Sequence, residues 1–243
     1  MARSGGGGGS SPAGEKWGEE ALCWRRDGAA VRPEAPVLVT LHGFRMNEDS
    51  FSLLLQGLFD LPIHILSFRG PRPAEGLTGA GPGASWYDYD GDQDRFRREL
   101  DRVEQTLLSA IDGAESTLGL RPGARFLLGF SQGGYCGSVI ALRRIDRFRG
   151  MIISGARVKA EILGPEMKAA AEAGFSALLC HGERDAAVPV EGAEKGEAAL
   201  LAAGVDATLA RFPGGHSLGR LQISAIRAWL SARLDVTPGR ELA

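Results

Sequence analysis

The 243-residue chain has few cysteines and no long apolar run. Its three cysteines, Cys23, Cys136 and Cys180, are odd in number and lack the spacing of a metal site, so we expect small buried side chains and no disulfide framework. No segment approaches the roughly 18 consecutive apolar residues that span a bilayer. The first residues also lack the apolar core of a signal peptide. We therefore expect a cytoplasmic protein without integral membrane association.

The chain also lacks an excess of charge of either sign. Lysine and arginine total 28 and the acidic residues 30, which gives a net charge of −2, and no basic stripe is concentrated anywhere. Nucleic-acid binding normally requires such a stripe, so we expect no nucleic-acid partner. The length, with 44% hydrophobic and 24% charged residues, suits one compact α/β domain with a full-sized core.

The first 19 residues differ in composition from the rest. Five consecutive glycines at 5–9 and the Ser-Ser-Pro that follows are typical of a flexible tail. We expect this tail over residues 1–19, one folded domain over residues 20–235, and a short tail over residues 236–243.

What the chain does have is a strand, a Gly-x-Ser-x-Gly motif and a helix in immediate succession around Ser131. A strained turn between a strand and a helix lifts a serine off the sheet edge, where a base can activate it. The N-terminus of the following helix points N–H groups at the place where an oxyanion would form. Ser131 is therefore the candidate nucleophile, although the motif alone also fits an ordinary turn.

Two later segments supply a candidate acid and a candidate base. Asp185 follows an apolar run at 176–180, and His216 lies in a glycine-rich loop after a predicted last strand at 207–212. The chemistry of open α/β sheets gathers at the carboxyl ends of the strands, where both would join Ser131. Taken singly, each could be an ordinary surface residue. The order serine, aspartate, histidine is nevertheless that of the α/β-hydrolases.

The predicted strand at 36–41 runs into His42-Gly43-Phe44. We predict that the backbone N–H groups of Phe44 and of Gln132, the residue after the nucleophile, form an oxyanion hole. Two side chains are candidates for the substrate pocket. Trp86, in the long segment 70–94 that we expect to be irregular, could line a pocket or pin that segment to the core, and Met46 lies just after the oxyanion-hole loop.

The alternation of strands and helices predicts a mostly parallel sheet with helices on both faces. We expect residues 20–35 to form a hairpin around Asp27-Gly28. About twenty residues separate the predicted strand at 151–154 from the one that starts at 176. That interval leaves little room for a large cap domain, so we expect an open site.

Several motifs together resemble the phospholipase/carboxylesterase family of α/β-hydrolases, which includes acyl-protein thioesterases and small bacterial carboxylesterases. The resemblance implies a triad of Ser131, Asp185 and His216. After His42-Gly43 the family usually has Leu-Gly-Asp, whereas this chain has Phe-Arg-Met-Asn, which favours ester hydrolysis over action on lipidated proteins. The motifs are Leu41-His42-Gly43, Ser85-Trp86-Tyr87-Asp88, Gly129-Phe130-Ser131-Gln132-Gly133-Gly134, His181-Gly182-x-x-Asp185-x-x-Val188-Pro189 and Gly215-His216.

We therefore expect a serine carboxylesterase that hydrolyses short- to medium-chain esters through an acyl-enzyme, with a small-molecule ester as its partner and no need for a metal or organic cofactor. Two alternatives stay open. The same residues could serve an acyl-protein thioesterase or lysophospholipase that acts on longer acyl chains, or the fold could be a binding protein without catalysis. The oligomeric state is also open, with a homodimer among the options.

Overall fold

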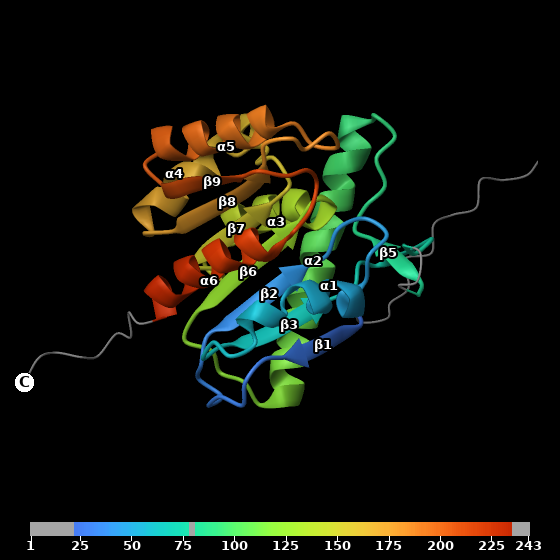
Figure 1. The fold of residues 1–243 in the computed structure, drawn as a ribbon, viewed down its shortest axis with the longest axis vertical. Helices are drawn as coiled ribbons and strands as arrows, with labels where there is room; N and C mark the ends of the chain where they lie inside the picture. The colour runs from blue at the N-terminus through green and yellow to red at the C-terminus, as the bar shows by residue number, and fades with distance from the viewer. Residues whose placement is uncertain (1–21, 78–80, 235–243) are drawn as a thin grey trace, which may run out of the picture.

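The computed structural model describes residues 22–77 and 81–234, so the expected tails at 1–19 and 236–243 lie outside the described residues. Seven strands form one sheet in the order β1-β3-β2-β6-β7-β8-β9 (Figure 1). Only β1 runs antiparallel to its neighbour among these strands. The predicted mostly parallel sheet is confirmed. The strands are β1 Trp24–Asp27, β2 Val37–Leu41, β3 His64–Phe68, β6 Arg125–Phe130, β7 Gly150–Ser154, β8 Ser176–Gly182 and β9 Asp206–Phe212.

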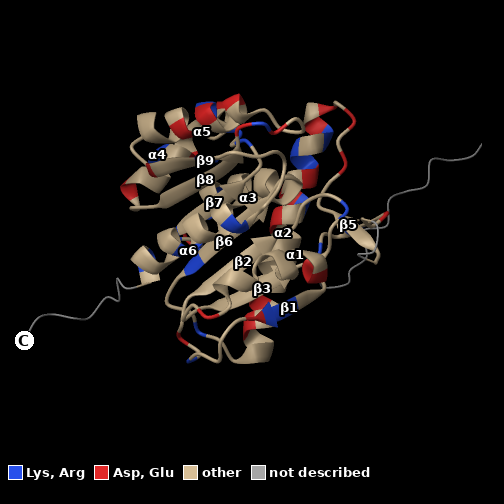
Figure 2. Ribbon diagram, in the orientation of Figure 1, with Lys and Arg blue, Asp and Glu red and all other residues tan. Residues whose placement is uncertain are grey.

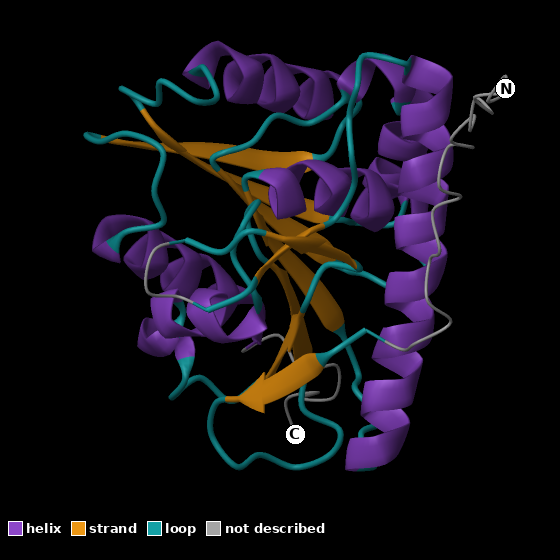
Figure 3. Ribbon diagram, turned by 90° about the vertical axis from the view of Figure 1, so that its right-hand side faces the viewer, coloured by secondary structure: helices purple, strands orange, loops and turns teal. Residues whose placement is uncertain are grey.

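Helices cover both faces of the sheet (Figure 3). One buried apolar cluster joins α2, α3, α4 and α5 to one face, and a second joins α1, η1 and α6 to the other. Each strand at the centre is therefore buried on both sides, which explains its continuous apolar sequence. The helices are α1 Glu48–Leu54, η1 Gln56–Leu58, α2 Gln93–Leu118, α3 Gln132–Arg143, η2 Ala160–Ile162, α4 Gly164–Glu172, α5 Val190–Ala202 and α6 Arg220–Leu234.

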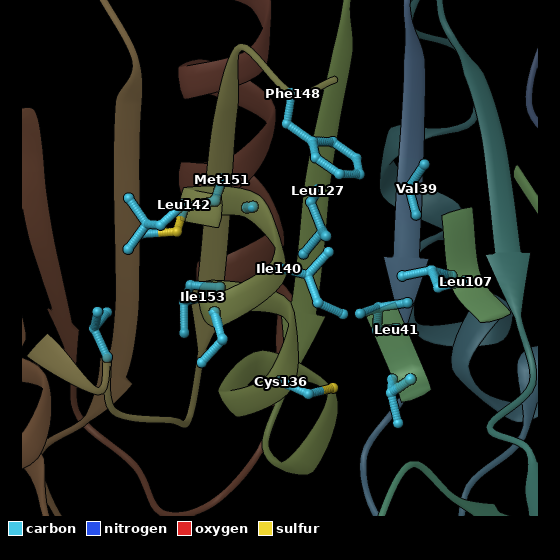
Figure 4. Packing of buried hydrophobic residues seen from close by; sticks show 14 of the residues in the cluster. Val39, Leu41, Leu107, Leu127, Cys136, Ile140, Leu142, Phe148, Met151 and Ile153 are labelled. Carbon is cyan, nitrogen blue, oxygen red and sulfur yellow. The ribbon is translucent and has the colours of Figure 1, made fainter. Parts of the chain in front are cut away.

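Helix α3 packs buried apolar side chains, among them Cys136 and Ile140, against the sheet (Figure 4). A Cβ on Gly137 would lie 2.6 Å from Cδ2 of Leu127 and 3.2 Å from Cδ1 of Leu41, so a larger residue there would force these side chains to shift. With this close approach, Val139 and Ile140 are fully buried against the strands. The helix that carries the first residues after Ser131 is thus held firmly against β6 and its neighbours.

The start of the long α2 is fixed by its N-cap residue, Asp92. Asp92 accepts hydrogen bonds from the N–H groups of Asp94 and Arg95 at 2.9 and 3.0 Å, which satisfies two of the unpaired donors at the start of the helix.

Figure 2 shows charged residues mainly on outer helices such as α2 and α5, while the central strands are mostly uncharged. This separation is the ordinary division of an α/β domain into an apolar core and a polar surface.

Three expectations need correction. Residues 20–35 do not form a hairpin, because β1 pairs with β3 and the interval that follows holds Pro33 and Pro36, which cannot donate to a strand ladder. Segment 70–94 is not wholly irregular, since β4 (Arg72–Ala74) and β5 (Gly83–Ser85) pair antiparallel. Cys23 is exposed rather than buried, whereas Cys136 and Cys180 are buried.

The connection from β7 to β8 consists of η2, α4 and short loops, so the described residues contain no large cap over this edge of the sheet. Among the helices in the described part of the chain, none has the length and apolar character to cross a bilayer.

Candidate active site

Ser131 occupies the turn between β6 and α3 in a strained backbone conformation. Its φ of 52° and ψ of −118° lie in a region that non-glycine residues seldom adopt. Its N–H donates to the Ser154 carbonyl at 2.9 Å, which ties the turn to β7. A Cβ on Gly133 would lie 2.4 Å from the carbonyl oxygens of Leu41 and His42. The turn is therefore tight enough to require glycine, and it presents the serine at the carboxyl edge of the sheet.

Three separate loops bring Ser131, Asp185 and His216 together. His216 Nδ1 lies 2.7 Å from Asp185 Oδ2, and His216 Nε2 lies 2.8 Å from Ser131 Oγ. An ionised carboxylate only accepts hydrogen bonds, so Nδ1 carries the proton and Nε2 accepts from the serine hydroxyl. Both distances fall within the range needed for proton transfer. The imidazole is thus in the tautomer that can take a proton from Ser131.

The Asp185 carboxylate is held in place by the backbone of its own loop. Its side chain is fully buried, and Oδ1 accepts the N–H groups of Ala187 and Val188 at 2.9 and 2.8 Å. Burial by itself raises the pKa of Asp185, but the hydrogen bonds from Val188, His216 and Ala187 outweigh it and hold the pKa below its usual value. The carboxylate is therefore ionised at neutral pH and can balance a protonated His216.

Phe44 and Gln132 carry the two backbone N–H groups that are predicted to form the oxyanion hole. Gln132 is the first residue of α3, so its N–H has no partner inside the helix. Within the described residues, neither this N–H nor that of Phe44 has a hydrogen-bond acceptor. The loop that carries Phe44 is anchored to β5, because the N–H of Arg45 donates to the Ala84 carbonyl at 3.0 Å.

The side chain of Gln132 has a role that the sequence analysis missed. Its Oε1 accepts the backbone N–H of Trp86 at 3.0 Å. Its Nε2 donates to the Tyr87 carbonyl and to Ser85 Oγ, both at 2.9 Å. The available signal was a polar amide at the start of a first turn that otherwise consists of Gly133, Gly134 and Tyr135. Through this amide, the turn that holds Ser131 is joined to segment 85–87.

Neither of the two expected pocket residues is among those that line the pocket beside Ser131. Trp86 is fully buried, and its Nε1–H donates to the His42 carbonyl at 2.8 Å. Its indole therefore anchors segment 85–87 to the core, the second of the two roles considered, because a buried tryptophan is stable where its N–H finds a partner. Met46 is also buried, in the apolar cluster that contains Phe51 and Phe130.

Two buried histidines shape the surroundings of the site without joining it. His42 donates Nδ1–H to the Gly43 carbonyl at 2.7 Å and accepts the Gly70 N–H at Nε2 at 2.9 Å. Burial lowers the pKa of His42 to about 4, so this imidazole is neutral near pH 7. His181 donates Nε2–H to the Val188 carbonyl at 2.8 Å and so supports the loop that carries Asp185.

A pocket of about 300 Å³ opens beside Ser131. A second, larger pocket of about 780 Å³ lies among residues at the amino ends of β2, β6, β8 and β9, at the opposite end of the sheet. Within residues 22–77 and 81–234, no group of three or more metal-ligating side chains could hold a metal ion. The pocket beside the serine is lined by Tyr87, Ser131, Gln132, Tyr135, Ala156, Arg157 and Val188.

Comparison with known proteins agrees with the fold. Esterase PE8 is similar at 24% identity and a TM-score of 0.71, over 88% of this chain and 99% of its own. The Bacillus cereus carboxylesterase is 17% identical with a TM-score of 0.69, over 88% and 95% of the two chains. Zea mays acyl-protein thioesterase 2 is 20% identical with a TM-score of 0.69, over 87% and 99%. These likenesses show a shared α/β-hydrolase fold. A family model described as phospholipase/carboxylesterase matches residues 29–234, and the chain therefore belongs to that family.

Proposed function

We propose that the protein is a serine carboxylesterase in which Ser131 is the nucleophile, His216 the general base and Asp185 the residue that orients His216. One observation carries the proposal. His216 bonds Asp185 through one ring nitrogen and Ser131 through the other, at 2.7 and 2.8 Å. This relation of acid, base and nucleophile is the one that activates a serine hydroxyl.

In the first half-reaction, Ser131 Oγ attacks the ester carbonyl carbon while its proton passes to His216 Nε2. The carbonyl oxygen becomes an oxyanion, and the N–H groups of Phe44 and Gln132 stabilise it. When the tetrahedral intermediate collapses, the bond to the alcohol oxygen breaks and His216 returns its proton to that oxygen. The acyl group is then bonded to Ser131.

In the second half-reaction, water takes the place of the alcohol. His216 removes one proton from the water as its oxygen attacks the acyl carbon, and then gives that proton to Ser131 Oγ as the acyl bond breaks. The carboxylic acid leaves and the enzyme returns to its starting state. Throughout, the ionised Asp185 stabilises the positive charge on His216.

The size of the pocket supports short- to medium-chain esters. Its volume of about 300 Å³ is at the lower end of the range typical of small-molecule sites. One similar structure is named as an acyl-protein thioesterase, so a test of the proposal has to include long acyl chains and thioesters.

The test is the hydrolysis of p-nitrophenyl esters with acyl chains from acetyl to palmitoyl, together with the matching thioesters, by wild type and Ser131→Ala. Ser138→Ala is the control, because Ser138 is a buried serine of the same helix that donates only to the Tyr135 carbonyl at 2.8 Å. We expect turnover that depends on Ser131 and peaks at short or medium chains.

Other outcomes would change the conclusion. A peak at palmitoyl substrates would favour the thioesterase or lysophospholipase alternative. Undiminished turnover by Ser131→Ala would rule out the proposed site. A folded wild type that hydrolyses none of the substrates would favour a binding protein.

A further inference from the structure

The pocket beside Ser131 contains one charged side chain among the described residues that line it, and that side chain belongs to Arg157. The other lining groups are aromatic, aliphatic or neutral and polar. Arg157 follows β7 at the carboxyl edge of the sheet, two residues after Gly155, whose φ of 58° turns the chain. A cation in an otherwise uncharged pocket next to the proposed nucleophile can select substrates by their charge.

Arg157 is supported from two sides. A Cβ on Gly192 would lie 3.1 Å from Arg157 Cβ and 3.8 Å from its Cδ, so the start of α5 packs against the stem of the side chain. The guanidinium carbon lies 5.5 Å from the centre of the Tyr135 ring, within the range of a cation–π contact. These contacts hold the guanidinium at the pocket beside Ser131.

The protein partner of this guanidinium is easily exchanged. Arg157 Nη1 lies 3.2 Å from Glu161 Oε1, and the two side chains are 45% and 52% exposed. Exposed ion pairs of this kind contribute little to stability. A guanidinium has five N–H donors in a flat fork, so a ligand could bind Arg157 while Glu161 turns to solvent.

A second cation lies close by. Lys159 is buried, donates from Nζ to Gln93 Oε1 at 3.1 Å, and lies 5.3 Å from the centre of the Phe96 ring. Burial lowers the pKa of Lys159, and the charge of Arg157 lowers it further against the opposing effect of Glu161. Lys159 does not line the pocket, but its charge adds to the positive potential around Arg157.

We propose that Arg157 is a specificity-determining residue that favours esters with a carboxylate on the group held in this pocket, such as half-esters of short dicarboxylic acids. The inference rests on the proposed esterase function. Arginine suits this role because its planar fork binds a carboxylate through two parallel hydrogen bonds. The carboxylate could belong to the acyl group or to the alcohol, and both positions present the same chemistry to Arg157.

The test compares charged and neutral substrates of matched shape. For the acyl side, the pair is mono-4-nitrophenyl adipate and 4-nitrophenyl heptanoate, with the uncatalysed rate subtracted. For the alcohol side, the pair is 4-carboxyphenyl butyrate and 4-carbamoylphenyl butyrate. The ratio of kcat/KM for each pair is measured in wild type, Arg157→Gln, Arg157→Lys and Glu161→Gln.

We expect wild type to prefer the charged member of at least one pair. Arg157→Gln should lower kcat/KM for that substrate by about tenfold or more, mainly through KM, since hydrogen bonds to charged groups are strong. The same variant should lower kcat/KM for the neutral ester much less, so that the ratio of kcat/KM for the charged and neutral members falls, because a neutral ester has no carboxylate for Arg157 to bind. Arg157→Lys should keep part of the preference, and Glu161→Gln should increase it by removing the competing carboxylate.

Two results would overturn the inference: equal wild-type rates for the charged and neutral members of both pairs, or an equal loss on both members in Arg157→Gln. Failure of the proposed function is a separate result, because hydrolysis of the neutral esters would then persist in Ser131→Ala. If the neutral esters are hydrolysed only when Ser131 is present, and the charged substrates are not preferred, the proposed function stands and only the specificity role of Arg157 is rejected.

Discussion

The two ends of the sheet differ in the size of their pockets and in their chemistry. The amino-end pocket is larger, at about 780 against 300 Å³, and three arginines, Arg32, Arg149 and Arg233, are among its lining residues. The smaller pocket at the carboxyl end adjoins a serine, a histidine and a buried carboxylate within hydrogen-bond distance of one another. We base the proposed active site on this arrangement of reactive groups, and not on the volume of the pocket.

The difference follows from the direction of the chain. In a parallel sheet with crossover helices, helix N-termini lie at the carboxyl edge and helix C-termini at the other edge. The start of α3 therefore offers N–H groups and partial positive charge beside Ser131, whereas the amino-end pocket faces the carbonyl ends of helices. The amino end instead carries structural contacts, such as Arg233 Nη2 to Asp206 Oδ2 at 2.7 Å.

The largest expected effect is at the carboxyl end. Ser131→Ala should lower kcat for esters by several orders of magnitude, toward the ~10⁶-fold seen when a serine nucleophile is removed, because no other group can form the acyl-enzyme. The fold should be retained, since alanine keeps the Cβ of serine and can take the same backbone conformation, and the one lost hydrogen bond to His216 is small beside total stability. Steady-state kinetics and circular dichroism check both parts. If the loss were under tenfold in the purified variant, catalysis would have to reside elsewhere, and the amino-end pocket would be the first place to look.

Asp185→Asn should cost less, about 10⁴-fold in kcat, because the nucleophile and base remain while the imidazole loses its orientation and counter-charge. The same variant tests pH dependence. The folded pKa of Asp185 lies below its unfolded value, so the carboxylate stabilises the protein above about pH 4, and this contribution is lost as pH falls through the folded pKa.

Thermal unfolding of both proteins between pH 7 and 3 measures this effect. The Tm of wild type should exceed that of Asp185→Asn at neutral pH, and the gap should shrink in acid. A gap that stayed constant down to pH 3 would mean that Asp185 does not ionise with a lowered pKa.

A smaller effect is expected from Gln132→Leu. The substitution keeps the backbone N–H but removes the hydrogen bonds to segment 85–87, and it leaves the Trp86 N–H and the Tyr87 carbonyl without this partner. We expect kcat/KM to fall by about tenfold and stability by about 1–3 kcal/mol. Gln56→Leu, at an exposed glutamine of η1, is the control and should change neither. Wild-type activity and stability in Gln132→Leu would show that the amide does not support the site.

The smallest effect on activity belongs to the amino end. Arg233→Met removes the bonds to Ser176 Oγ at 2.8 Å and to Asp206 Oδ2, so we expect the free energy of unfolding to fall by about 1 kcal/mol. The value of kcat/KM should stay within about twofold of wild type. A tenfold loss of kcat/KM with unchanged stability would connect the larger pocket to catalysis and contradict the assignment of activity to the carboxyl end alone.

Much of this arrangement was predictable from sequence because it depends on strand order and direction. An apolar strand followed by Gly-x-Ser-x-Gly predicts where Ser131 lies, and the carboxyl ends of β8 and β9 must come to the same edge as that of β6. The structure duly brings Asp185 and His216 to Ser131.

The lining of the pocket was not predictable in the same way. Tyr87, Tyr135, Arg157 and Val188 come from four different segments, and their meeting depends on how the loops pack over the sheet edge. Trp86 could not be assigned from sequence, because an aromatic in a long loop suits either a pocket wall or an anchor. Its bond to the His42 carbonyl decides between the two roles. The antiparallel pairing of β1 with β3 is likewise a long-range choice that a local turn signal does not reveal.

The central claim, that ester hydrolysis at the carboxyl end depends on Ser131 activated by His216, has one direct test. A fluorophosphonate is incubated with wild type, Ser131→Ala, His216→Ala and Ser138→Ala, and the adduct is located by peptide mass spectrometry. We expect a single adduct on Ser131 in wild type and in Ser138→Ala, much slower labelling in His216→Ala, and none in Ser131→Ala. Labelling of Ser131→Ala at the wild-type rate, or an adduct on a different residue of wild type, would contradict it.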